Sequence, residues 1–193
     1  MPTRTIYLVR HGQENKETRP NELGGMLTDL GEAQARVTAD FLQPLPITAI
    51  HASTLRRAKQ TAEILAPCFP HLTLKHTNLL WECVPTVPPA LEDAMANVSP
   101  EQLQHEQARI ALAYDRYFQA PLGDQDQHDL IVCHGNLIRY FVCRVLETPL
   151  DMWINLEIFN CGVTCIEVRG NGRKVLVYHN SHTHLRADRL TFV

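Results

Sequence analysis

The chain has 193 residues, of which 45% are hydrophobic and 20% are charged, so it is long and apolar enough to bury a core. We expect a single domain over residues 1–193. The formal net charge of -3 provides no general basic field for nucleic acid. No apolar run approaches the roughly 18 residues that a membrane-spanning helix needs. Nucleic-acid and membrane partners are therefore not expected, and an anion site would have to be built locally.

The six cysteines are dispersed along the chain, and no two of them form a C-x-x-C pair. Residues 1–4 lead directly into an apolar run, with no secretory signal before it. Free thiols and the absence of such a signal are typical of a reducing compartment. We therefore expect a cytoplasmic protein without disulfides.

The N-terminal half alternates short apolar runs with amphipathic segments. In chain order, the pattern predicts a strand at 5–9, a helix within 27–46, a strand at 47–53, a helix that Ser53 caps, and a strand at 71–75. Thr28 or Asp29 can cap the first helix, with Glu32 completing a capping box after Asp29. This alternation is typical of a parallel sheet covered by helices.

The C-terminal half continues the same alternation after an irregular, proline-rich loop at 83–98. The predicted elements are a helix from Ser99 to about Gln119, a strand at 129–133, a helix at 136–147, a shorter helix from Pro149, and strands at 162–168 and 173–179. Gly170-Asn171-Gly172 predicts a tight hairpin turn between the last two strands. We expect an α/β fold of three layers, α/β/α, with a mostly parallel central sheet and an antiparallel edge from the C-terminal hairpin.

Cationic and imidazole side chains lie where the predicted strands end. The first strand ends in Arg10-His11-Gly12, and the strand at 129–133 is followed by His134-Gly135-Asn136. In open α/β sheets, ligands bind beyond the carboxyl ends of the strands. Arg56-Arg57 opens a helix, where a cation opposes the helix dipole unless it shares an anion or extends to water. Together these groups favour an anion site over the alternative of solvated arginines.

The order of these motifs resembles the histidine phosphatase superfamily, which includes phosphoglycerate mutases and many phosphatases. The matching residues are Arg10-His11-Gly12, then Ser53-x-Leu55-x-Arg57-Ala58-x-x-Thr61-Ala62, then Glu82, then His134-Gly135. The segments 79–89 and 131–153 are similar to the catalytic domain of the PGAM-like mitochondrial serine/threonine protein phosphatases. The ordered set is far more specific than Arg-His-Gly alone.

This resemblance implies a metal-independent phosphomonoesterase that works without a cofactor. His11 would be the nucleophile and form a phosphohistidine, while Arg10, Arg57 and His134 would form a cationic pocket for the phosphoryl oxygens. Arg57 is preferred to Arg56 because it directly precedes Ala58, as in the motif. The substrate would be a phosphorylated small molecule or a phosphoprotein, and the sequence does not indicate an oligomeric state.

Glu82 is the candidate general acid, and its pKa should be raised by burial against the influence of the nearby cations. The weaker candidates for the same role are Glu14, Glu17 and Glu22, in the loop after the first strand. Polar groups that could line the phosphate or substrate site are Gly12, Gln13, Asn15, Gly135 and Asn136.

Three alternatives accompany this hypothesis. The first is a mutase that returns the phosphoryl group to a sugar acid, and the second is a non-catalytic binding protein on the same fold. The third is a zinc hydrolase that uses His179, His182 and His184, although their spacing has no helical i,i+4 pair. We expect no metal site there, and we expect one of these three histidines to border the phosphate pocket instead.

Overall fold

The protein is known from a computed structural model, which describes residues 1–18 and 23–192. In this part of the chain, six strands form one sheet in the order β3-β2-β4-β1-β5-β6. The strands are β1 (Thr3–Arg10), β2 (Ala49–Ser53), β3 (Leu74–Thr77), β4 (Gln127–Cys133), β5 (Val163–Arg169) and β6 (Lys174–Ser181). Strands β1 to β4 pair in parallel, whereas β5 is antiparallel to β1 and β6 is antiparallel to β5.

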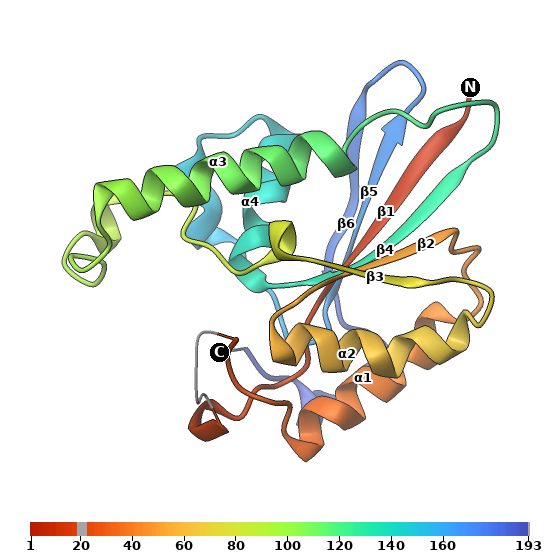
Figure 1. The fold of residues 1–193 in the computed structure, drawn as a ribbon, viewed down its shortest axis with the longest axis horizontal. Helices are drawn as coiled ribbons and strands as arrows, with labels where there is room; N and C mark the ends of the chain where they lie inside the picture. Colours follow the sequence, from red (N-terminus) through yellow and green to blue (C-terminus); the bar gives the residue numbers. More distant parts are fainter. Residues whose placement is uncertain (19–22, 193) are drawn as a thin grey trace.

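Helices cover both faces of this sheet, as the sequence predicts. The four α-helices in the described residues are α1 (Asp29–Leu42), α2 (Arg56–Leu65), α3 (Pro100–Tyr117) and α4 (Gly135–Leu146). Helices α1 and α2 lie on one face, and α3 and α4 lie on the other (Figure 1). The predicted three-layer arrangement and the antiparallel edge from the C-terminal hairpin are therefore confirmed.

The side chains of β1 alternate between two apolar cores, one on each face of the sheet. Ile6 and Leu8 pack with the residues of α3 and α4 around Phe141. Val9 packs on the opposite face with residues of α1 and α2 such as Leu65. Because β1 is central and buried on both faces, its sequence is an almost continuous apolar run. This rigid strand carries Arg10 to the edge of the sheet and positions His11 directly after it.

The helix starts agree with the sequence in two cases and differ in a third. Ser99 and Gln102 form the predicted capping box of α3, and Thr28 caps α1 by accepting from the Gly31 N–H. Ser53, however, does not cap α2, which begins at Arg56 without a side-chain cap. The Ser53 hydroxyl instead contacts His134 at the end of β4.

Several predicted segments change length or type in the structure. Strand β3 begins at Leu74 rather than at residue 71, and the short helix after Pro149 is a 3₁₀ helix at Leu150–Asn155. The turn between β5 and β6 contains Gly172 with φ of +83°, a conformation that glycine adopts without strain.

All six cysteines are free thiols. Within the described residues, no helix is both long enough and apolar enough to cross a membrane.

Candidate active site

The carboxyl ends of β1 and β4 lie side by side, because Arg10 pairs with Cys133 in the parallel register of the two strands. A cleft of about 790 Å³ opens at this edge of the sheet. It is lined by Arg10, His11, Glu14, Lys16, Gly24, Leu55, Arg57, Trp81, Glu82, Gly135, Asn136, Arg139, Glu157 and Phe192. Six residues predicted from the motifs thus meet in one cleft: Arg10, His11, Arg57, Glu82, Gly135 and Asn136.

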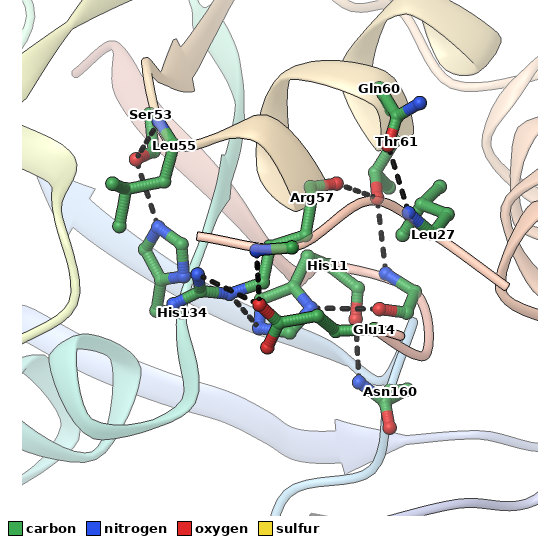
Figure 2. A network of polar contacts seen from close by, with 12 residues as sticks. His11, Glu14, Leu27, Ser53, Leu55, Arg57, Gln60, Thr61, His134 and Asn160 are labelled. Atoms are coloured by element: carbon green, nitrogen blue, oxygen red, sulfur yellow. Dashed lines mark hydrogen bonds and ion pairs between the residues drawn. The ribbon is translucent and has the colours of Figure 1, made fainter. Parts of the chain in front are cut away.

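His11 is held in one tautomer by the backbone. Its Nδ1 lies 2.7 Å from the Gly12 carbonyl oxygen, so Nδ1–H donates and Nε2 keeps its lone pair. The Nε2 atom accepts a hydrogen bond of 3.0 Å from Arg57 Nε (Figure 2). The ring is buried, with 3% of the residue exposed. A neutral imidazole with an oriented lone pair at Nε2 is the form that a nucleophilic histidine requires.

Two residues that are distant in sequence fix the backbone around His11. The Thr61 hydroxyl on α2 accepts from the Gly12 N–H at 3.0 Å. Asn160 donates from Nδ2 to the His11 carbonyl oxygen at 2.9 Å. Thr61 belongs to the motif, but no local pattern marks Asn160, which lies 149 positions away in the chain. Sequence reasoning therefore missed Asn160.

The structure distinguishes Arg57 from Arg56, which helical spacing alone does not. Arg57 is 8% exposed, lines the cleft and contacts His11, whereas Arg56 lies in a different surface depression with Lys59. The Nη1 atom of Arg57 lies 3.5 Å from Glu14 Oε1. Arg57 therefore presents a buried cation to the site, as the motif indicates.

His134 is buried beside the His11 ring, with 5.2 Å between the two ring centroids. Burial lowers the pKa of His134 well below 6.5, and His11, Arg57 and the other nearby cations lower it further. The ring is therefore neutral at physiological pH, which corrects the prediction that it belongs to a cationic pocket. It can act there as a neutral hydrogen-bond donor.

The proton of this neutral ring is positioned by Ser53. The Ser53 Oγ accepts from the Leu55 N–H at 3.2 Å and lies 2.8 Å from His134 Nε2 (Figure 2). When the hydroxyl donates to Nε2, the ring proton resides on Nδ1. Among the described residues, Nδ1 of His134 has no hydrogen-bond partner although it is buried. A bound anion would supply the acceptor that this nitrogen lacks.

Glu82 lies in the wall of the cleft, in the segment between β3 and α3. Its Oε1 accepts from the backbone N–H groups of Cys83 and Asn136, each at 3.1 Å. Burial raises the pKa of Glu82, although these two hydrogen bonds and the charges of Arg57 and Arg10 oppose the increase. A carboxyl group whose pKa is raised although two arginines lie nearby is suited to general-acid chemistry.

The first turn of α4 contributes to the cleft differently from the prediction. The Asn136 N–H at the helix start donates to Glu82, so it positions the candidate acid rather than an anion. The Asn136 side chain donates from Nδ2 to the Cys83 carbonyl oxygen at 3.1 Å. Arg139, one turn later, lines the cleft and donates to Asn136 Oδ1 at 2.9 Å. Arg139 and Lys16 are cleft cations that the sequence reasoning did not include.

The predicted phosphate contacts of Gly12, Gln13 and Asn15 are not supported, because none of the three lines the cleft. The Gly12 N–H is occupied by Thr61. Gln13 instead contacts α1: its N–H donates to Gln34 Oε1, and its Oε1 accepts from the Thr28 hydroxyl. Gly12 and Gln13 thus pack the loop after β1 against the start of α1, and the Asn15 N–H donates to the Met26 carbonyl oxygen.

Of the two weaker acid candidates that the structure describes, Glu14 lines the cleft and Glu17 does not. The Oε1 atom of Glu14 accepts from the Gly25 N–H at 2.7 Å, and the Glu14 side chain is 7% exposed. Glu17 is exposed and is absent from the cleft lining. Glu22 lies outside the described residues. Glu82 has the raised pKa expected of an acid, whereas Glu14 is paired with Arg57.

The three C-terminal histidines contact separate partners. His179 lies against Thr164 and the Glu157 carbonyl oxygen, and His184 contacts the Thr38 hydroxyl. His182 contacts the Asn180 carbonyl oxygen. No cluster of three or more potential ligands from His, Cys, Asp and Glu occurs among residues 1–18 and 23–192. None of the three histidines borders the cleft, so that expectation was wrong; Phe192 lines it from this end of the chain.

Curated relatives resemble this chain over almost its full length. The mitochondrial serine/threonine-protein phosphatase Pgam5 of Caenorhabditis elegans is 32% identical over 194 residues, which are 98% of this chain and 67% of the relative. The corresponding protein of Drosophila mojavensis is 35% identical over 201 residues, covering 97% of this chain and 66% of the relative. The Xenopus laevis PGAM5 is 32% identical, covering 88% of this chain and 62% of the relative. The chain thus spans about two thirds of the length of these relatives.

Solved structures share the fold. A phosphoglycerate mutase from Plasmodium falciparum superposes with a TM-score of 0.67 at 32% identity, covering 100% of both chains. A phosphoserine phosphatase from Entamoeba histolytica gives a TM-score of 0.69 at 18% identity, covering 95% of this chain and 100% of that one. The family model described as histidine phosphatase superfamily (branch 1) matches residues 6–181. The chain therefore belongs to branch 1 of the histidine phosphatase superfamily.

Proposed function

We propose that this chain is a metal-independent phosphatase, which hydrolyses phosphomonoesters, including those on proteins, through a phosphohistidine at His11. The observation that carries the proposal is the pairing of His11 with Glu82 in one cleft. His11 presents a neutral ring with an oriented Nε2 lone pair, and Glu82 presents a carboxyl group with a raised pKa to the same cleft. A nucleophile and an acid are the two groups that a two-step phosphoryl transfer requires.

In the first step, the lone pair of His11 Nε2 forms a bond to phosphorus while the bond to the leaving oxygen breaks. The leaving oxygen receives the electron pair and takes the proton of Glu82, which becomes a carboxylate. The phosphoryl group takes the place of Arg57 Nε at the His11 lone pair, and the guanidinium then donates to its oxygens. Nδ1 of His134 supplies a neutral donor.

In the second step, water attacks the phosphorus of the phosphohistidine, and the P–N bond breaks with its electron pair returning to Nε2. The Glu82 carboxylate accepts the proton from this water, which restores the acid for the next cycle. Inorganic phosphate leaves the cleft. The hydrogen bond from Nδ1 to the Gly12 carbonyl oxygen stabilises the ring through both steps.

Protein phosphoesters are included in the proposal because curated relatives named serine/threonine-protein phosphatases match up to 98% of this chain. A second candidate, phosphoryl transfer between phosphoglycerates, is supported by the Plasmodium falciparum phosphoglycerate mutase at 32% identity. Both reactions would use the same nucleophile. They differ in whether water or a sugar acid accepts the phosphoryl group.

The purified chain is expected to hydrolyse an aryl phosphate in the presence of EDTA, and His11→Ala should lower that activity by about 10³-fold or more, since the nucleophile is lost. A parallel panel of phosphopeptides, small phosphate esters and phosphoglycerates would identify the substrate class. Activity that EDTA abolishes and zinc restores would contradict the metal-free mechanism. Transfer between phosphoglycerates at a rate above hydrolysis would favour the mutase, and inactivity of the wild type on every ester would favour a binding protein.

A further inference from the structure

Arg109 on α3 contacts the segment that carries Glu82 at three points. Its Nη1 donates to the carbonyl oxygens of Leu79 at 3.0 Å and Trp81 at 3.1 Å. Its Nη2 donates to the carbonyl oxygen of Glu82 itself at 3.0 Å. The planar guanidinium, with several donors in fixed directions, is suited to holding a set of carbonyls in one arrangement. Arg109 is absent from the cleft lining.

The same helix anchors the residues that follow Glu82. Glu106 Oε2 accepts from the Val84 N–H at 2.6 Å, and Gln107 donates to the Pro85 carbonyl oxygen at 3.0 Å. Helix α3 therefore fixes the backbone on both sides of Glu82. Within the described residues, Arg109 forms no ion pair with a carboxylate, so its contacts with backbone carbonyls are its main polar interactions.

The carboxyl group of Glu82 depends on this backbone arrangement. One of its two hydrogen bonds comes from the N–H of the next residue, Cys83, and the other from Asn136 on α4. The Glu82 carbonyl oxygen that Arg109 holds belongs to the same peptide unit as the Cys83 N–H. Rotation of that peptide would break the contact with Arg109 and move the N–H away from the Glu82 carboxyl group together.

We propose that Arg109 is a positioning residue for the general acid. It touches no reacting atom, and it acts by fixing the peptide unit that aims the Glu82 proton at the leaving oxygen. The inference rests on the proposed function, because it requires Glu82 to be the acid. Loss of Arg109 should therefore impair the reaction in proportion to how much the leaving group needs a proton.

The test compares kcat/KM for two aryl phosphates, since this parameter reports the step in which the leaving group departs. The 2,4-dinitrophenolate of dinitrophenyl phosphate leaves without a proton, whereas the phenolate of phenyl phosphate needs one. Glu82→Gln should lower kcat/KM for phenyl phosphate by about 10²-fold or more and leave that for dinitrophenyl phosphate nearly unchanged. Arg109→Gln should reproduce this selectivity with a loss of about tenfold on phenyl phosphate, and Arg109→Lys should fall between it and the wild type.

Arg116→Gln is the matched control, since Arg116 is an exposed arginine on the same helix that contacts the Tyr117 ring. It should leave the ratio of the two kcat/KM values unchanged. If Arg109→Gln lowers kcat/KM equally for both substrates, the positioning role is overturned, because a folding defect lowers both values alike. It is also overturned if Arg109→Gln lowers kcat/KM for neither substrate. If Arg109→Gln does not fold, Arg109→Lys serves for the same comparison. If Glu82→Gln changes kcat/KM equally for the two substrates, Glu82 is not the general acid, and the inference about Arg109 fails with it.

Discussion

At the scale of single residues, Glu14 places a carboxylate in the proposed phosphate site. Its side chain is almost fully buried in the cleft, and its carboxylate faces Arg57 with 3.5 Å between Oε1 and Nη1. An entering phosphoryl group must compete with this carboxylate for the same guanidinium. Like charges at such distances repel each other by about 1 kcal/mol in water and by more where water is excluded. Glu14 should therefore weaken the binding of phosphate and promote its release as product.

We predict that Glu14→Gln lowers the inhibition constant for inorganic phosphate by about fivefold or more, since one like charge is removed while the amide oxygen can still accept from the Gly25 N–H. Competitive inhibition of aryl phosphate hydrolysis measures this constant. Glu17→Gln is the matched control, because it neutralises an exposed carboxylate three residues away in the same loop. An unchanged or higher inhibition constant in Glu14→Gln would show that the carboxylate does not oppose phosphate.

At the scale of elements, the site depends on a close approach between the loop after β1 and the first turn of α1. A Cβ added to Gly12 would overlap the carbonyl oxygen of Gly31, and a Cβ added to Gly31 would overlap that of Gln13. Backbone atoms meet on both sides of this contact, so flexible side chains cannot relieve the overlap. This close backbone contact positions the Gly12 carbonyl oxygen at the His11 ring and the Gly12 N–H at the Thr61 hydroxyl.

Gly12→Ala is expected to lower the free energy of unfolding by about 1–3 kcal/mol, the usual cost of inserting a methyl group into packed structure. It should also reduce kcat, because the displaced Gly12 carbonyl no longer orients the His11 ring. Urea unfolding and aryl phosphate hydrolysis on the same preparation measure the two effects. Unchanged stability and activity would mean that α1 shifts freely, in conflict with the observed packing.

At the scale of the whole molecule, several partly or fully buried imidazoles have lowered pKa values. Burial lowers the pKa of His51 from 6.5 to about 4, and Lys75, Arg116 and Arg4 contribute. Burial is also the main cause that lowers the pKa values of His134, His179 and His184. At pH values between each lowered pKa and 6.5, the ordinary pKa of histidine in the unfolded chain, the unfolded chain binds more protons than the folded protein. The stability that these histidines contribute is thus present above about pH 6.5 and is lost as the pH falls.

The contribution of these histidines to the free energy of unfolding should therefore decrease from about pH 7 to about pH 4, as urea titrations across that range would measure. The raised pKa values of Glu82 and Asp129 act in the opposite direction, so the comparison of the wild type with a histidine variant isolates the histidine contribution. His51→Phe should reduce the slope, because the phenyl ring keeps the edge contact with Tyr117 without a titrating group. His76→Phe, at an exposed position, controls for the exchange of an imidazole for a phenyl ring. A slope in His51→Phe equal to that of the wild type would exclude His51 as a source of the acid sensitivity.

The sequence by itself determined the alternation of strands and helices, the two strand ends that carry histidines, and the ordered motif from Arg10 to His134. These follow from local chemistry: apolar periodicity, turn residues, caps and the spacing of residue types along the chain. The same reasoning assigned Ser53 to a helix cap and Gln13 to phosphate. Both hydrogen bond across the fold instead, to His134 and to α1. Local spacing carries no information about such distant partners.

Only the tertiary structure decided that His134 is neutral, that Arg109 contacts the Glu82 carbonyl oxygen, and that the first turn of α4 donates to the Glu82 carboxyl group. Each of these depends on burial or on contacts between segments far apart in the chain. Burial changes the energy of a charge, and a hydrogen bond requires its partners within about 3 Å, so both are set by packing and not by composition. The order of residues in the sequence identifies the chemical groups of the site, whereas the fold determines their protonation states and their orientations.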